Sequence, residues 1–150
     1  MDAFLPVIEK LNQEVESEQS ERCMRSTPEK ILIVDANTPS RRTMEDLLRR
    51  AGYEVSATGL CHEVLELARK NQVDLVVLDT GLPGLLCSDL LSELKSASVT
   101  AGIRVFLLEA GGPQERARAL DLRADDVLSR PCDPIEMLAR IRRQLSAKRV

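Results

Sequence analysis

Two uninterrupted apolar runs, residues 31–34 (ILIV) and 75–78 (LVVL), constrain the fold more than any other feature. Short runs with β-branched side chains are typical of strands that are buried on both faces. Such strands occur in parallel sheets that helices cover on both sides. Aromatic residues make up only 2% of the chain, so the core must be built from Leu, Val, Ile and Ala.

Helical segments alternate with strands along most of the chain. The predicted strands span residues 31–34, 54–57, 75–78, 105–108 and 127–128. The predicted helices, whose apolar residues recur at the spacing of one buried face, span residues 39–51, 64–70, 88–95, 114–120 and 134–145. Right-handed crossovers between such elements produce a doubly wound α/β fold with a five-stranded parallel sheet and five helices.

Local signals mark where two of these helices begin and where one ends. Thr38 is the predicted N-cap of the first helix, with Pro39 at its first position, and Gly52 is the predicted left-handed cap. Asp133 and Glu136 have the spacing of an N-cap and its N3 partner around the start of the last helix.

Residues 1–28 differ from the rest of the chain, and we predict a leader segment there and one domain at residues 29–150. Part of the leader has a heptad-like apolar stripe formed by Phe4, Ile8, Leu11 and Val15. About two heptads are too few for a coiled coil. The stripe therefore predicts either a docking or dimerisation helix or a partly ordered leader that lies on its own domain.

Ionisable residues follow four of the predicted strands. They are Asp35, Asp79, Glu109 and Arg130. In a doubly wound sheet, ligands bind beyond the carboxyl ends of the strands, where the strand order reverses. These four side chains are therefore the candidate functional site.

The segments KILIVDAN, RRAGYEV, DLVVLDTGLPG and RADDVLSRPCDPIEMLARIRRQL carry a specific family resemblance. From about residue 30 to residue 145, the chain resembles the receiver domain of response regulators in two-component signalling. The most specific signals are Pro83, four residues after Asp79, and the Arg-Pro pair after the last strand. The resemblance implies a flavodoxin-like sheet with strand order 2-1-3-4-5.

The resemblance also implies a chemistry for the site. In this family the aspartate at position 79 accepts a phosphoryl group from a histidine kinase, and two adjacent acidic residues after the first strand hold Mg²⁺. A Thr or Ser follows the fourth strand, a Lys precedes the last proline, and an aromatic residue lies on the fifth strand. A carboxylate that attacks a phosphate needs a cation to neutralise the charge on both groups.

This chain departs from the family pattern at most of those positions. Asp35 matches the first acidic residue, but Ala36 replaces the second. Glu109 replaces the hydroxyl residue and brings a negative charge to the place of the phosphoryl oxygens. Arg130 replaces the lysine with a planar fork that suits a carboxylate, and Val127 replaces the aromatic residue.

These replacements predict an atypical receiver. With one carboxylate lost, Asp35 and Asp79 are left as metal ligands, so we expect no resident cofactor and only weak Mg²⁺ binding. We predict that Arg130 lies within ion-pair reach of Asp79 or Glu109 and takes the place of the metal. The module would then signal through protein contacts with weak or no dependence on phosphorylation. The alternative is a conventional Mg²⁺-dependent receiver that a histidine kinase phosphorylates on Asp79.

Composition and motifs disfavour other classes of function. The net charge of −3 and the few aromatic residues disfavour nucleic-acid binding. The loop after the first strand has no glycine to admit a phosphate, which disfavours a flavin or nucleotide enzyme. The four cysteines form no C-x-x-C pair, so a zinc site is not expected.

We therefore expect a stand-alone, non-enzymatic module in the cytoplasm, without a membrane segment. Its expected partner is a histidine kinase or another signalling protein. A homodimer through the leader or through the last two helices is a further alternative.

Overall fold

The computed structural model describes residues 27–81, 87–121 and 124–148. Its strands are β1 (Lys30–Val34), β2 (Glu54–Thr58), β3 (Leu75–Asp79), β4 (Arg104–Glu109) and β5 (Asp126–Ser129). Its helices are α2 (Thr38–Arg50), the 3-10 helix η2 (Cys61–Glu63), α3 (Val64–Lys70), α4 (Cys87–Ser96), α5 (Pro113–Asp121) and α6 (Pro134–Lys148). The predicted alternation is confirmed, with the bounds of the elements shifted by no more than a few residues.

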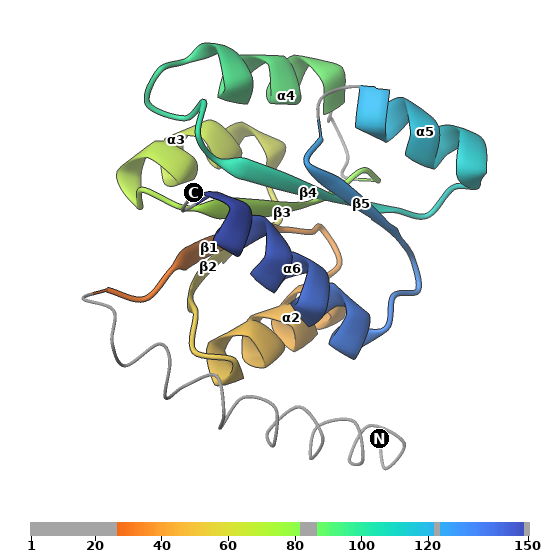
Figure 1. Cartoon of the computed structure of the whole chain (residues 1–150), viewed down its shortest axis with the longest axis horizontal. Helices are drawn as coiled ribbons and strands as arrows, with labels where there is room; N and C mark the ends of the chain where they lie inside the picture. The colour runs from red at the N-terminus through yellow and green to blue at the C-terminus, as the bar shows by residue number, and fades with distance from the viewer. Residues whose placement is uncertain (1–26, 82–86, 122–123, 149–150) are drawn as a thin grey trace.

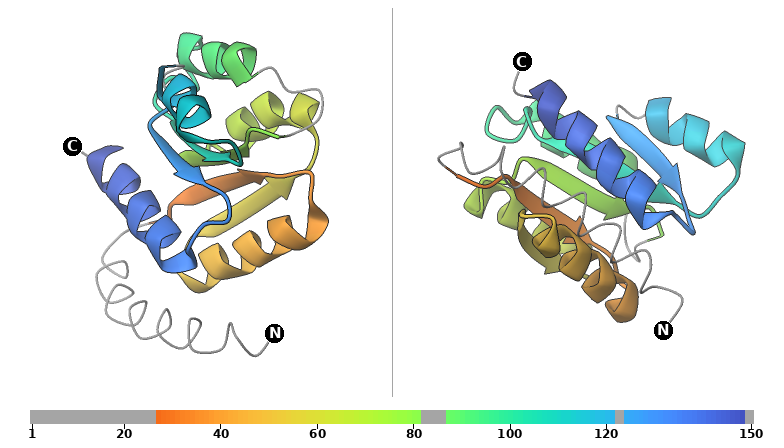
Figure 2. Two further views of the ribbon diagram at one scale, coloured as in Figure 1. Left: turned by 90° about the vertical axis from the view of Figure 1, so that its right-hand side faces the viewer. Right: turned by 60° about the horizontal axis from the view of Figure 1, so that its bottom comes forward.

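The five strands form one parallel sheet in the order β2-β1-β3-β4-β5, which confirms the flavodoxin-like arrangement. The chain starts at β1 inside the sheet, moves outward to β2 and then crosses to β3, so the strand order reverses between β1 and β3. Figures 1 and 2 show the resulting layers, with α2 and α6 on one face of the sheet and α3, α4 and α5 on the other.

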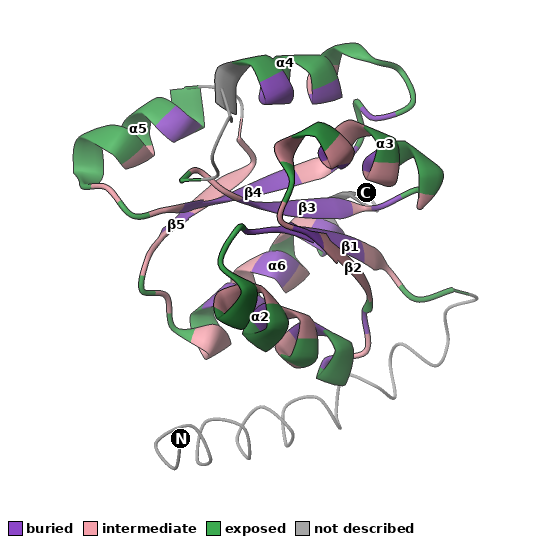
Figure 3. Cartoon of the chain, turned by 180° about the vertical axis from the view of Figure 1, so that it is seen from behind, coloured by how far each residue is buried: buried purple, intermediate pink, exposed green. Residues whose placement is uncertain are grey.

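Alternate residues of the central strands supply two separate cores, because successive side chains of a strand point to opposite faces. The core beneath α2 and α6 contains Ile31, Ile33, Leu75, Val77, Phe106 and Leu108. The core beneath α3, α4 and α5 contains Leu32, Val34, Val76, Leu78, Val105 and Leu107. Figure 3 shows the buried strands enclosed by helices whose outer faces are exposed. The apolar runs are therefore explained by burial on both faces of the sheet.

The start of α2 differs from the prediction by one residue. The N-cap is Asn37, whose side-chain oxygen accepts a hydrogen bond from the backbone N–H of Ser40 at 2.9 Å. Thr38, the predicted N-cap, is instead the first residue of the helix. Asn and Thr are both good N-caps, and the extended backbone of Asn37 (φ −80°, ψ 110°) decides between them.

The other two predicted boundaries are confirmed. Gly52 follows α2 with φ 93°, a left-handed conformation that favours glycine. Asp133 caps α6, because its carboxylate accepts hydrogen bonds from the backbone N–H groups of Ile135 and Glu136 at 2.8 and 3.4 Å. This cap starts α6 next to the segment that carries Arg130.

Some predictions fall on residues outside the described ranges. They are the leader stripe at Phe4, Ile8, Leu11 and Val15, and the proline at position 83. In the described part of the chain, Cys61 and Cys132 are free thiols. No helix in that part is long and apolar enough to cross a membrane.

Candidate functional site

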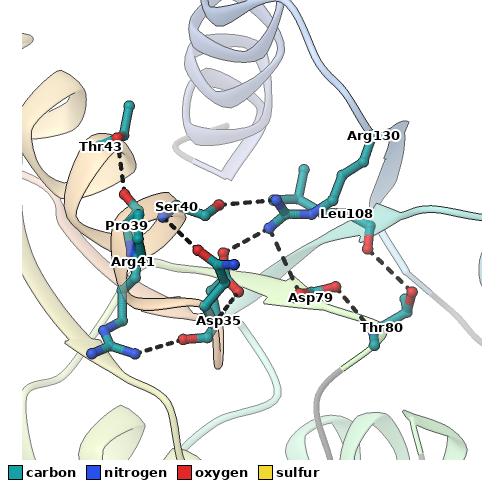
Figure 4. A network of polar contacts seen from close by, with 11 residues as sticks. Asp35, Pro39, Ser40, Arg41, Thr43, Asp79, Thr80, Leu108 and Arg130 are labelled. Carbon is teal, nitrogen blue, oxygen red and sulfur yellow. Dashed lines mark hydrogen bonds and ion pairs between the residues drawn. The ribbon is translucent and has the colours of Figure 1, made fainter.

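The carboxyl ends of β1, β3 and β5 bring Asp35, Asp79 and Arg130 together (Figure 4). Asp35 directly follows β1, Asp79 is the last residue of β3, and Arg130 follows β5. β1 and β3 are paired neighbours, and their register aligns Val34 with Leu78. The two carboxylates therefore start from adjacent strands at the same edge of the sheet, at the reversal of strand order.

Asp35 is fully buried, and both of its carboxylate oxygens have partners. Oδ1 accepts a hydrogen bond from the backbone N–H of Asn37 at 2.9 Å, and Oδ2 accepts one from Nη2 of Arg130 at 2.8 Å. Its backbone carbonyl accepts a hydrogen bond from Nη1 of Arg41 at 2.8 Å. The loop between β1 and α2 is thus held around the Asp35 side chain.

Arg130 is the cation of the site. Its Nη2 lies 2.8 Å from Oδ2 of Asp35 and 3.8 Å from Oδ2 of Asp79, so one nitrogen faces both acids. Its Nη1 donates a hydrogen bond to the hydroxyl of Ser40 at 2.9 Å. Its backbone N–H donates to the carbonyl of Glu109 at 2.9 Å, which extends the pairing of β4 with β5 as far as Arg130.

The pKa of Asp35 follows from these contacts. Burial alone raises the pKa of this carboxyl, because a charge is less well solvated away from water. Hydrogen bonds from the Asn37 backbone N–H and the Ser40 hydroxyl, together with the Arg130 guanidinium, outweigh burial, and the net pKa lies below its usual value. Asp35 is therefore held in its charged form.

Asp79 shows the opposite shift. Burial is the largest cause and raises the pKa of its carboxyl. A hydrogen bond from the Gly81 backbone N–H, at 3.0 Å from Oδ1, and the charge of Arg130 lower this pKa. The neighbouring Asp35 carboxylate raises it again, and the pKa of Asp79 ends above its usual value. Asp79 is the carboxylate of the pair whose charge is less well compensated.

The predicted contact of Arg130 is confirmed for one of its two named partners. Asp79 lies within ion-pair distance, whereas among the described residues Arg130 forms no ion pair with Glu109. The Glu109 carboxylate instead accepts a hydrogen bond from the backbone N–H of Gly111 at 3.0 Å. The shortest ion pair of Arg130, with Asp35, was not predicted.

The remaining positions surround this cluster. Ala36 is exposed, and Val127 is half-buried in β5. The hydroxyl of Thr80, directly after Asp79, donates a hydrogen bond to the carbonyl of Leu108 at 3.2 Å. This contact fixes the segment after β3 to β4, beside the site.

Sequence reasoning missed Ser40 and Arg41 as members of the site. The Asn37 cap and the following proline place both residues in the first turns of α2, beside the end of β1. A polar side chain in the first turn of the helix after β1 is the signal that could have identified them. The partner of Ser40 is 90 residues away, which no local pattern reveals.

The acidic residues do not fit a resident Mg²⁺ ion. Mg²⁺ prefers oxygen ligands in near-octahedral geometry, and one oxygen of Asp35 is already paired with Arg130. Within the residues that the structure describes, no group of three His, Cys, Asp or Glu side chains could hold a metal ion. A guanidinium occupies the position between the two carboxylates where a cation would be needed.

Comparison with known proteins agrees with this geometry. Residues 31–142 match the response regulator receiver domain family. The chain is 32% identical over 113 residues to the phosphate regulon transcriptional regulatory protein PhoB of Pseudomonas aeruginosa, covering 75% of the chain and 49% of the relative. It is 34% identical over 116 residues to the transcriptional regulatory protein HprR of Escherichia coli, covering 77% and 51%. The chain thus spans about half the length of these curated relatives.

Solved structures lead to the same conclusion. A response regulator from Desulfuromonas acetoxidans matches with a TM-score of 0.73 and 28% identity, covering 79% of this chain and 98% of that one. A CheY-like receiver domain protein from Methanospirillum hungatei has a TM-score of 0.74 at 22% identity, covering 82% and 98%, and supports the fold alone. With the strand order, the paired aspartates and the family match in agreement, the chain belongs to the response regulator receiver domain family of two-component systems.

Proposed function

We propose that this receiver domain is an atypical one, in which Arg130 supplies the positive charge that a metal ion supplies in a conventional receiver. The proposal depends on one observation: Nη2 of Arg130 faces Oδ2 of both Asp35 and Asp79. The domain would signal by contacting another protein, with weak or no dependence on phosphorylation of Asp79.

The charges of the pocket support this proposal. Phosphoryl transfer to a carboxylate brings further negative charge to the site, and catalysis depends on cations placed against that charge. The guanidinium of Arg130 is already bound to Asp35, and Ala36 adds no ligand for a second cation. Glu109 adds a carboxylate at the end of β4, where the family has a neutral hydroxyl.

A conventional Mg²⁺-dependent receiver, phosphorylated on Asp79 by a histidine kinase, is the second candidate. It is favoured by the distance of 3.8 Å between Arg130 and Asp79, which is 1.0 Å longer than the 2.8 Å contact with Asp35. The side chain of Asp79 also keeps 18% of its surface exposed, so a small phosphodonor has access to it.

Titration with Mg²⁺ and beryllofluoride, a mimic of the phosphoryl group, separates these candidates. A ligand at 100 times its Kd stabilises a protein by about 2.7 kcal/mol, which raises the Tm of a domain of this size by roughly 5–10 °C. We expect no such shift for the native chain. A shift of that size that is lost in Asp79→Asn would favour the conventional receiver and contradict our proposal.

We extend the proposal to partners and location. The expected partner is a histidine kinase or another signalling protein in the cytoplasm, and a homodimer is the alternative. We also propose that residues 1–28 are a leader separate from the receiver domain and that the domain catalyses no reaction of its own. PhoB and HprR are transcriptional regulators about twice as long as this chain. We therefore propose only of the receiver domain itself that it acts as a stand-alone module and that it does not bind nucleic acid.

A further inference from the structure

Ser40 connects the start of α2 to the segment that follows β5. Its hydroxyl accepts a hydrogen bond from Nη1 of Arg130 at 2.9 Å, across 90 residues of sequence (Figure 4). The same hydroxyl also lowers the pKa of the Asp35 carboxyl, as a donor facing that carboxylate does. A hydroxyl can accept from one group and donate to another, so Ser40 can serve both members of the Asp35–Arg130 ion pair while it holds Nη1 of Arg130.

The guanidinium of Arg130 has few other anchors. Its Nη2 is bound to Asp35, and its Nη1 is bound to Ser40. Its Nε is buried and has no hydrogen-bond partner among the described residues. The orientation of the guanidinium plane therefore depends on two hydrogen bonds, one at each terminal nitrogen, besides the longer ion-pair contact of Nη2 with Asp79. Loss of the Ser40 contact leaves the guanidinium held through Nη2 alone, about which the group can turn.

Capping of α2 does not explain the Ser40 hydroxyl. Asn37 is the cap, and it binds the backbone N–H of Ser40 rather than the side chain. The neighbouring hydroxyl of Thr43 shows the ordinary behaviour, because it donates to the carbonyl of Pro39 within the same helix at 2.9 Å. The Ser40 side chain instead bonds to Arg130, in the segment between β5 and α6.

We propose that Ser40 is a positioning residue that holds Arg130 between Asp35 and Asp79 and thereby sets how strongly the pocket excludes a divalent cation. This inference rests on the proposed function, in which Arg130 takes the place of a metal ion. The inference adds a residue that controls whether a metal ion can replace the guanidinium. A cation gains access to the two carboxylates only when the guanidinium moves away from them.

The test uses three variants of the full chain, each with a single substitution. Ser40→Ala removes the hydroxyl, Ser40→Thr keeps it, and Thr43→Ala is a matched control that removes a hydroxyl outside the pocket. The first readout is the ¹⁵N NMR spectrum of the Arg130 guanidinium, in which a group held at both ends gives separate Nη1 and Nη2 signals. The second readout is the affinity for Mg²⁺ alone, from a chemical-shift titration.

For the native chain, Ser40→Thr and Thr43→Ala, we expect separate Nη signals and equally weak Mg²⁺ binding. For Ser40→Ala we expect averaged Nη signals and Mg²⁺ binding about fivefold tighter, the factor that corresponds to one ordinary hydrogen bond. Retention of separate signals with unchanged Mg²⁺ affinity in Ser40→Ala would overturn the inference. Averaged signals in Ser40→Thr would also overturn it, because the hydroxyl would then not be the cause.

The variant Arg130→Gln distinguishes a failure of this inference from a failure of the proposed function on which it rests. If Arg130 takes the place of a metal ion, its removal must tighten Mg²⁺ binding by more than Ser40→Ala does. Tighter binding in Arg130→Gln with no change in Ser40→Ala refutes the role of Ser40 alone. Unchanged binding in Arg130→Gln refutes the proposed function, and the Nη signals of Ser40→Ala then decide by themselves whether Ser40 positions the guanidinium.

Discussion

Asp125, just before β5, and Asp79, at the end of β3, are exposed to almost the same extent, with 15% and 18% of their side-chain surfaces accessible. Asp125 lies at the amino end of the sheet and has three partners: Nζ of Lys95 at 3.0 Å, Nη1 of Arg104 at 3.1 Å and the backbone N–H of Val105 at 2.7 Å. Asp79 lies at the carboxyl end and shares one arginine with a second carboxylate.

The difference indicates that the surroundings of an acid, rather than its exposure, distinguish a structural acid from a candidate functional one. At Asp125, two cations and an amide compensate one carboxylate. Asp79 also has one amide partner, the Gly81 backbone N–H at 3.0 Å, but its only cation is 3.8 Å away and is shared with Asp35. The pKa of Asp79 is raised by burial and by Asp35. Incomplete compensation is typical of functional sites, where charge is arranged for a task other than stability.

The largest effect on stability is expected for Asp125→Ala. This change leaves two partly buried cations and a backbone N–H without their acceptor, and we expect it to lower the free energy of unfolding by about 3 kcal/mol. Urea unfolding measures this change. The control is Asp46→Ala, which removes an exposed i,i+4 pair with Arg50 and should cost less than about 0.5 kcal/mol. A loss at Asp125 no larger than that of the control would show that its three contacts contribute no more than an exposed ion pair.

A smaller effect is expected for Arg130→Gln. The buried carboxylate of Asp35 loses its cation but keeps the hydrogen bond from the Asn37 backbone N–H, so we expect a loss of about 2 kcal/mol at neutral pH. The same urea series measures it, with Arg50→Gln as a control in an exposed pair. If Arg130→Gln were as stable as this control, the guanidinium would contribute nothing to holding the two carboxylates together.

The smallest effect, of opposite sign, is expected for Asp79→Asn. The folded pKa of Asp79 lies above its unfolded value, so the stability that its protonated form contributes is lost as the pH rises through the folded pKa. An amide cannot ionise, and we therefore expect Asp79→Asn to be at least as stable as the native chain at pH 7. The advantage should disappear as the pH falls below the usual aspartate range, near pH 4.

Thermal melts of both proteins from pH 4 to pH 8 measure this dependence. Asp35 provides the contrast, because its folded pKa is lowered and its contribution to stability is lost as the pH falls rather than as it rises. A melting temperature for Asp79→Asn that stays below the native value throughout this range would show that the Asp79 charge is fully compensated.

The sequence was sufficient for the fold because burial on both faces leaves an uninterrupted apolar run that is visible without a structure. It also placed the candidate side chains at the right edge of the sheet, since Asp35 and Asp79 each directly follow a four-residue apolar run. The sequence could not predict which side chains pair inside the pocket. Glu109 and Asp35 are equivalent as strand-end residues, and only the direction of each side chain decides that Arg130 binds Asp35 while Glu109 bonds to Gly111.

The acidic and basic side chains of the pocket are carried by strands at different positions in the sheet. β1 and β3, which carry the two aspartates, each have a neighbour on both sides, whereas β5, which leads to Arg130, has a neighbour on one side only. The two acids therefore lie at the ends of interior strands, and the arginine follows an edge strand. We expect a change in the charge between them to displace β5 and the following α6 before it displaces the central strands.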